Sequence, residues 1–267
     1  MEGVIARNYL GQYETLEQHI VMCLEVSQKI GSHALDEAIT YLPSDLPFLE
    51  WLREELRIYL IYYHDTGKQT SEFQQKVKHN LGTKSPHAIH SAVIYLKEAR
   101  QRMGVDLPKQ QLWAYLISYV IASHHGEVTP TGLYKYEQTL QQYLMKQDYL
   151  KIGWVDGQVI QDYLDVWQAF DWECELTLRE FDVLKEALNY LQSVDHEAAY
   201  QFMLSQLSNN IYKDDVAGID EFTEQLKELK ETLGIKINIG DEVKRYMEKI
   251  AKDRVGERAH ARMVEQE

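Results

Sequence analysis

The chain has 267 residues, of which 45% are hydrophobic and 26% charged, and its formal net charge is −14. This length allows one large domain or two small ones. The acidic balance argues against recruitment of DNA by the charge of the whole protein, while leaving room for a local basic patch. Two cysteines without CxxC spacing, Cys23 and Cys174, fit a reducing cytoplasm. No apolar run reaches the roughly 18 residues that span a bilayer, so we expect neither a membrane segment nor a signal peptide.

The predicted elements are helices. Leu, Glu, Gln, Lys and Ala are frequent, and the five prolines all fall between helical stretches, so the composition favours an all-α protein. Residues 1–12 are expected to form an extended lead-in. Thr15-Leu16-Glu17-Gln18 predicts a capping box that opens a helix to Ile30, closed by Gly31. His19 lies on or beside the buried face of this helix, and Cys23 is expected to be a core residue.

After a short helix and a proline-containing loop predicted between Ala34 and Leu46, a helix predicted from Leu49 to Tyr63 leads into His64-Asp65-Thr66-Gly67-Lys68. Neighbouring side chains on a helix point about 100° apart, but at its last turn His64 and Asp65 can lean into one cavity. An imidazole beside a carboxylate is a natural start for a divalent metal site. Ser71-Glu72-Phe73-Gln74 then predicts a second capping box and a short helix to His79.

Two further predicted helices carry histidines. One runs from His87 to about Met103 and has His90 on its apolar side, which His87 could share. The other begins at Pro108, is apolar over much of its surface and ends in Ser123-His124-His125-Gly126. Like His64-Asp65-Thr66-Gly67, this segment places metal-ligating residue types at the end of an apolar helix, followed by a glycine.

Helices are also predicted over residues 136–147, 159–170, 176–191, 197–212, 222–233 and 242–250. The helix over 197–212 ends in Lys213-Asp214-Asp215. Asp214 continues the apolar stripe of Leu204, Leu207 and Ile211, so it is favoured over Asp215 as the residue that faces the interior. The chain shows no internal repeat and no P-loop motif.

Five imidazoles and two carboxylates therefore occur on apolar helices in a fixed order: His19, His64, Asp65, His90, His124, His125 and Asp214 or Asp215. Imidazole and carboxylate together suit Mn, Fe, Co, Ni or Zn, whereas a magnesium site is normally richer in oxygen.

This order resembles the HD phosphohydrolase superfamily in its extended form H…HD…H…HH…D. The chain is most similar to the HD nuclease domain of the type I CRISPR interference helicase-nuclease, over roughly residues 10–220. The similarity includes His64-Asp65-Thr66-Gly67-Lys68 with Phe73-Gln74, His90-Ser91, and Ser123-His124-His125-Gly126. It departs at Lys213-Asp214-Asp215, where the family usually has an Ala-Asp-Arg-like step. We therefore expect an HD-domain helical bundle over 1–220 and a helical extension or linker over 221–267.

The resemblance implies a two-metal site. Asp65 would bridge the ions, with His19, His64 and Asp214 on the first and His90, His124 and His125 on the second. Mn, Ni, Co or Fe would serve as cofactor, with Mg as a further candidate, and the ions would lower the pKa of a bridging water. Lys68 would neutralise charge on the phosphoryl oxygens, although a lysine after a glycine is otherwise an exposed loop residue.

The function implied by the resemblance is an endonuclease of antiviral defence that cuts single-stranded DNA. Its partners would be the CRISPR helicase and effector complex. Two alternatives stay open: an HD phosphohydrolase acting on a nucleotide or cyclic nucleotide, which the net charge of −14 favours, and an inactive helical scaffold.

Overall fold

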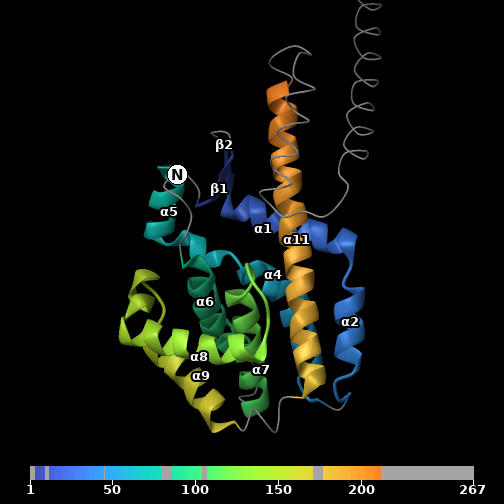
Figure 1. Cartoon of the computed structure of the whole chain (residues 1–267), viewed down its shortest axis with the longest axis vertical. Coiled ribbons are helices and arrows are strands. Elements are labelled where there is room, and N and C mark those ends of the chain that lie inside the picture. Colours follow the sequence, from blue (N-terminus) through green and yellow to red (C-terminus); the bar gives the residue numbers. More distant parts are fainter. Residues whose placement is uncertain are drawn as a thin grey trace, which may run out of the picture. The chain divides into compact units, whose positions relative to one another are not determined.

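The structure, a computed structural model, describes residues 4–9, 12–44, 46–79, 86–103, 107–170 and 177–211, with side chains to 206 in the last of these. Helices make up most of these residues, and the strands among them form one hairpin near the start (Figure 1). The predicted all-α class is confirmed. Among the described helices none is both long and apolar enough to cross a bilayer.

The N-terminal hairpin pairs β1 (Ile5–Tyr9) with β2 (Gln12–Thr15) in antiparallel register, so that Arg7 lies opposite Glu14. Helix α1 (Leu16–Ile30) follows directly, and its predicted capping box is confirmed. The Thr15 hydroxyl accepts from the Gln18 amide at 3.2 Å, and the Gln18 side chain accepts from the Thr15 amide at 3.0 Å. Gly31 ends the helix with φ 74°, a conformation that favours glycine.

The helical run predicted from Leu49 to Tyr63 is present as three consecutive elements, which follow α2 (His33–Thr40). These are α3 (Leu49–Glu54), a π-helical turn η1 (Glu55–Tyr59) and α4 (Leu60–Tyr63). Within η1, Glu55 is fully buried and accepts two hydrogen bonds from Arg102, at 2.8 and 2.9 Å. Because Arg102 ends α6, this ion pair ties the run to that helix.

A short 3₁₀ turn, η2 (Thr66–Gln69), packs unusually closely on α6 (His87–Arg102). The Gly67 amide donates to the Ser91 hydroxyl at 2.8 Å. A Cβ on Gly67 would lie 2.0 Å from the His87 carbonyl oxygen, so a side chain is excluded here. This contact fixes the turn after His64 and Asp65 against the first turns of α6.

The prediction of a capping box at Ser71 is wrong. Helix α5 (Ser71–Lys78) begins after Thr70, and no side chain caps its first turn. The Gln74 side chain instead accepts from the Ile5 amide and donates to two carbonyls, that of Ile5 at 2.8 Å and that of Lys68 at 2.7 Å. Gln74 therefore fastens the N-terminal hairpin to the turn that carries the His-Asp pair.

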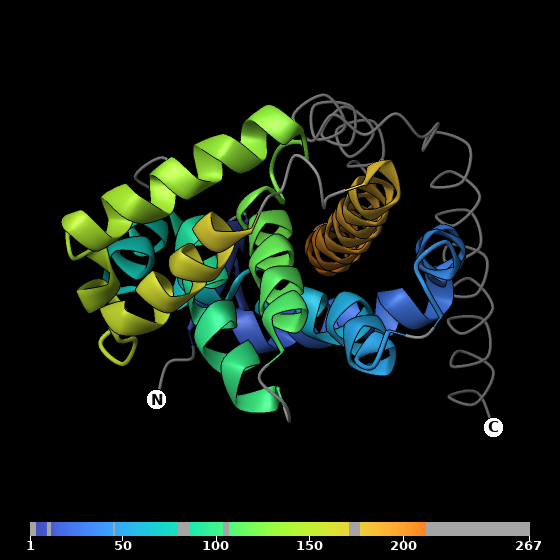
Figure 2. The ribbon, with the colours of Figure 1, turned by 90° about the horizontal axis from the view of Figure 1, so that it is seen from below.

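The core is centred on α7 (Pro108–Ala122), which is buried along most of its length. Figure 2 shows α7 between α8 (Pro130–Met145) and α9 (Gly157–Ala169) on one side and α11 (Leu178–Ile211) on the other. A 3₁₀ turn, η3 (Asp148–Lys151), lies between α8 and α9.

The two helices predicted over 176–191 and 197–212 are one, because α11 continues for 34 residues without a break. No glycine or proline falls within it, so nothing in the sequence interrupts its hydrogen-bond ladder. Residues 1–206 form one compact unit. Asp214, Asp215, the helices predicted over 222–250 and the domain boundary predicted near residue 220 lie outside the described residues.

Candidate metal centre

Two histidines at helix ends are held in the same way. His64, which follows α4, has Nδ1 2.6 Å from the Ile61 carbonyl oxygen, and His124, which follows α7, has Nδ1 2.7 Å from the Ile121 carbonyl oxygen. A carbonyl accepts only, so Nδ1 is the donor in both rings, and Nε2 is the ring nitrogen left to face a metal. Both Nε2 atoms are buried and make no hydrogen bond. This is the arrangement of histidines that ligate a metal through Nε2.

Asp65 lies between two groups of histidines and is almost fully buried. Its Oδ2 is 3.3 Å from His19 Nε2 and 3.5 Å from His64 Nε2. Its Oδ1 is 3.5 Å from His87 Nε2 and 3.6 Å from His124 Nε2. Metal bonds of about 2.0–2.2 Å place neighbouring ligand atoms of one ion about 3–3.6 Å apart. Each Asp65 oxygen is thus at ligand spacing from one group.

The first group consists of His19, His64, Asp195 and Cys23, whose ligand atoms all lie within 4.8 Å of one another. Asp195 comes from the middle of α11, and its Oδ1 is 3.1 Å from His19 Nε2 and 3.8 Å from His64 Nε2. The group therefore joins the first helix of the chain to the last one described.

The second group consists of His87, His124 and His125, whose ligand atoms are again within 4.8 Å of one another. His87 Nε2 and His125 Nε2 approach to 3.0 Å. Burial lowers the pKa of His87 to about 3. Partial desolvation of the His125 ring, with His124 beside it, lowers the pKa of His125 to about 4, so both imidazoles are neutral near pH 7 and can act as ligands.

The structure brings together five of the seven ligands expected from the sequence: His19, His64, Asp65, His124 and His125. It places His90 in neither group. His90 Nδ1 is 2.6 Å from the Tyr143 hydroxyl on α8, and His87, three residues earlier on α6, lies at the centre instead. The cause is the close contact of Gly67 with the His87 carbonyl, which sets the His-Asp turn against the first turn of α6. Asp214 is not among the described residues.

Asp195 is not among the ligands predicted from the sequence. It falls between the two helices predicted over 176–191 and 197–212. Asp195 comes four residues after Leu191 and seven after Leu188, both buried, so the 3/4 spacing of α11 placed it on the inner face.

Lys68 is buried, so the alternative of an exposed loop lysine is wrong. Its Nζ lies 2.5 Å from Asp65 Oδ2. Burial opposes ionisation of Asp65, but the Lys68 ammonium and His64 hold the pKa of its carboxyl well below the usual range. Burial likewise opposes ionisation of Asp195, but a hydrogen bond from His19 and the nearby imidazole of His64 hold the pKa of that carboxyl well below its usual range. Both carboxylates are therefore charged near pH 7.

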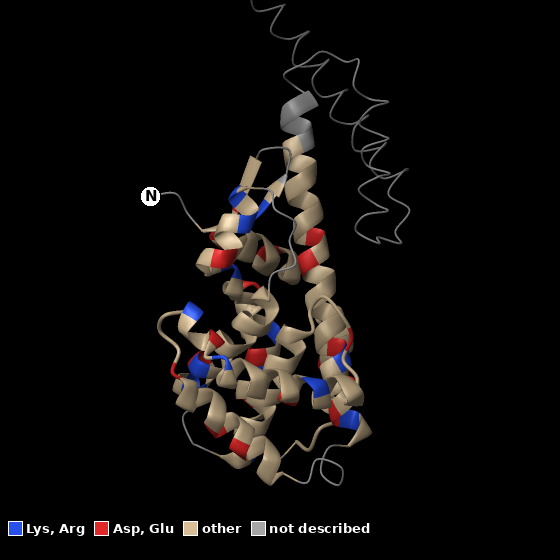
Figure 3. Ribbon diagram, turned by 60° about the vertical axis from the view of Figure 1, so that its left-hand side comes forward, with Lys and Arg blue, Asp and Glu red and all other residues tan. Residues whose placement is uncertain are grey.

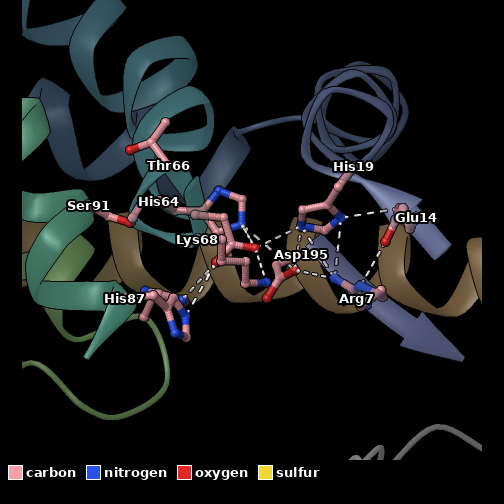
Figure 4. Close-up of polar contacts among 12 residues, drawn as sticks. Arg7, Glu14, His19, His64, Thr66, Lys68, His87, Ser91 and Asp195 are labelled. Atoms are coloured by element: carbon pink, nitrogen blue, oxygen red, sulfur yellow. Dashed lines mark hydrogen bonds and ion pairs between the residues drawn. The ribbon is translucent and has the colours of Figure 1, made fainter. Parts of the chain in front are cut away.

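The N-terminal hairpin surrounds the far side of His19 (Figure 4). Glu14 Oε1 is 3.4 Å from His19 Nδ1, and Glu14 Oε2 is 2.7 Å from Arg7 Nε. Arg7 Nη2 in turn is 3.4 Å from Asp195 Oδ1. Burial opposes a proton on His19, yet the carboxylates of Asp195 and Asp65 hold the pKa of its imidazole well above the usual value. A cation at Nε2 must displace that proton.

The donors fit divalent metal ions. They are imidazoles and carboxylates at ligand spacing, and the buried Nε2 atoms of His64 and His124 and Oδ1 of Asp65 have no hydrogen-bond partner. An all-α protein that gathers helix-end histidines around one buried aspartate in this way belongs to the HD class of metal-dependent hydrolases.

Residues 7–210 match the family model described as Cas3, HD domain. The chain therefore belongs to the Cas3 HD family, whose place is in CRISPR interference. The resemblance seen in the sequence is confirmed. No curated protein and no solved structure matches the chain.

Proposed function

We propose that this chain is a two-metal nuclease that hydrolyses phosphodiester bonds of single-stranded DNA in CRISPR interference. The observation that carries the proposal is Asp65, with Oδ2 facing His19 and His64 and Oδ1 facing His87 and His124. In this assignment the first ion takes His19, His64, Asp65 and Asp195. The second takes Asp65, His87, His124 and His125. In this assignment Asp195 replaces Asp214, and His87 replaces His90, as the ligands expected from the sequence.

Bound as a pair, divalent ions supply a water of lowered pKa and a clamp on the phosphodiester. The protein contributes the fixed charges around them. Lys68 holds an ammonium group 2.5 Å from Asp65, where it can stabilise negative charge that develops on the phosphoryl oxygens. The imidazole-rich donors favour Mn, Fe, Co or Ni, and magnesium is a further candidate because two carboxylates are present.

A comparison of two histidines on α6 tests the second ion. We expect His87→Ala to lower the metal content from about two ions to about one per chain, because it removes a ligand of one group. His90→Ala is the matched control, since His90 is buried on the same helix but bonds Tyr143 instead. Elemental analysis of the purified variants measures the difference. Loss of an ion from the His90 variant alone would return that residue to the ligand set.

Access to the centre favours a flexible strand. His64, His87 and His124 are buried, whereas His125 is exposed and Asp195 is 14% exposed, so the centre meets solvent beside these two residues. Basic and acidic residues are interspersed over the described helices (Figure 3), so binding must rest on the centre and its rim. Of the aromatic residues that flank the His-Asp pair, Tyr63 and Phe73 are buried, and Tyr62 is exposed and available to stack on a base.

We therefore expect cleavage of single-stranded DNA to exceed that of a blunt duplex by about tenfold or more, because a stiff duplex cannot bend its phosphates into the centre. The measurement compares end-labelled strands with the matched duplex in Mn²⁺ or Ni²⁺. Equal rates on both would refute the strand preference.

The same assay includes a panel of nucleotides and cyclic nucleotides. Hydrolysis of these with intact DNA strands would instead support a small-molecule phosphohydrolase, which the net charge of −14 favours. The proposed partners, a CRISPR helicase and effector complex in the cytoplasm, follow from the family and would supply unwound DNA.

A further inference from the structure

The first group contains a sulfur atom. Cys23 lies four residues after His19 on α1, so the two side chains share one face of the helix. The thiol is fully buried, and Sγ is 3.6 Å from His19 Nε2 and 4.0 Å from His19 Nδ1. The prediction that Cys23 is a core residue is confirmed. Its Sγ also lies within 4.8 Å of ligand atoms of His19, His64 and Asp195.

The spacing is that of two ligands on one ion. Metal–sulfur bonds of about 2.3 Å and metal–nitrogen bonds of about 2.0–2.1 Å, at ligand angles of about 90–110°, separate sulfur from nitrogen by about 3.1–3.6 Å. A second observation points to the same ion. Nε2 of His64 is fully buried and makes no hydrogen bond, although Nδ1 of the same ring is satisfied by the Ile61 carbonyl. The group thus contains an unused donor as well as the sulfur.

We propose that Cys23 is a thiolate ligand of the first ion and that it selects a thiophilic cation for this position. The inference rests on the proposed metal centre. On binding, the thiol proton passes to solvent and a sulfur–metal bond replaces the S–H bond, without any change of oxidation state. With one sulfur, imidazoles and carboxylates, the position favours Co²⁺, Ni²⁺, Fe²⁺ or Zn²⁺ over Mn²⁺ and Mg²⁺. The second group, which contains imidazoles and the other oxygen of Asp65, lacks this discrimination.

Cobalt spectroscopy on the full chain tests the proposal. Cys23 and Cys174 are the only cysteines, so Cys174→Ser leaves a single thiol. We expect this variant with Co²⁺ to show a thiolate-to-cobalt charge-transfer band in the near ultraviolet, beside the visible d–d bands of bound cobalt. Cys23→Ser and Cys23→Ala should lose the charge-transfer band, keep the d–d bands and lose about tenfold or more of the affinity for Co²⁺ relative to Mn²⁺.

The outcomes separate this inference from the function on which it rests. Visible d–d bands without a charge-transfer band in Cys174→Ser would refute thiolate ligation and leave the metal centre intact. Failure of the wild-type chain to bind Co²⁺ or Mn²⁺ would overturn the proposed function instead. Because Cys174→Ser keeps Cys23, the decisive spectrum does not depend on whether either Cys23 variant folds.

Discussion

Asp65→Asn is expected to lower cleavage of single-stranded DNA by about a thousandfold or more while the helical fold is retained. The substitution keeps the shape of the side chain but removes its charge and one of the two oxygens that face the histidine groups. Single-turnover cleavage in Mn²⁺, with metal content from elemental analysis, measures the effect. Circular dichroism reports whether the helices are intact.

Glu72→Gln is the matched control for Asp65. It also removes one carboxylate charge, but Glu72 is a surface residue paired with Lys76 on α5. We expect near wild-type cleavage from this control. Near wild-type turnover of a folded Asp65→Asn protein would contradict the bridging role.

A second large effect is expected at Asp195. Asp195→Asn should remove about one ion per chain and reduce cleavage by about a hundredfold or more, because Oδ1 of Asp195 is 3.1 Å from His19 Nε2. Asp214→Asn and Asp215→Asn should keep both ions and their activity. The comparison needs all three variants, measured for metal occupancy and for DNA cleavage.

The reverse pattern would restore the assignment first suggested by the sequence. Loss of metal and activity in the Asp214 variant, with a normal Asp195 variant, would place the last ligand beyond α11. Equal losses in all three variants would show an effect of helix packing and would remove Asp195 from the ligand set.

Much of the fold was predictable because its signals are local. Thr15 and Gln18 form a capping box within one turn, and Gly31 ends the same helix with positive φ. The apolar run from Leu49 to Tyr63 predicted its helix, since the π-helical turn inside it does not interrupt the helical path. Such features need only the residues themselves and their close neighbours in sequence.

The parts of the centre that were missed depend on tertiary contacts. His87 and His90 share a side of α6, so periodicity could not choose between them. The contact of Gly67 with the His87 carbonyl places His87 at the centre. This contact joins segments that lie 20 residues apart in the chain. Glu14 was also missed because its contact with His19 depends on a tertiary feature, the N-terminal hairpin. No turn motif in the sequence predicts that hairpin.

The unbroken course of α11 makes the centre sensitive to insertions and deletions in an uneven way. Most ligands lie in the first turn of a helix or just after its last turn. Asp195 has helix on both sides, and each added residue between it and the packed Leu191 would rotate it by about 100° and advance it by about 1.5 Å. Among homologues, this stretch should therefore vary by substitution at constant length.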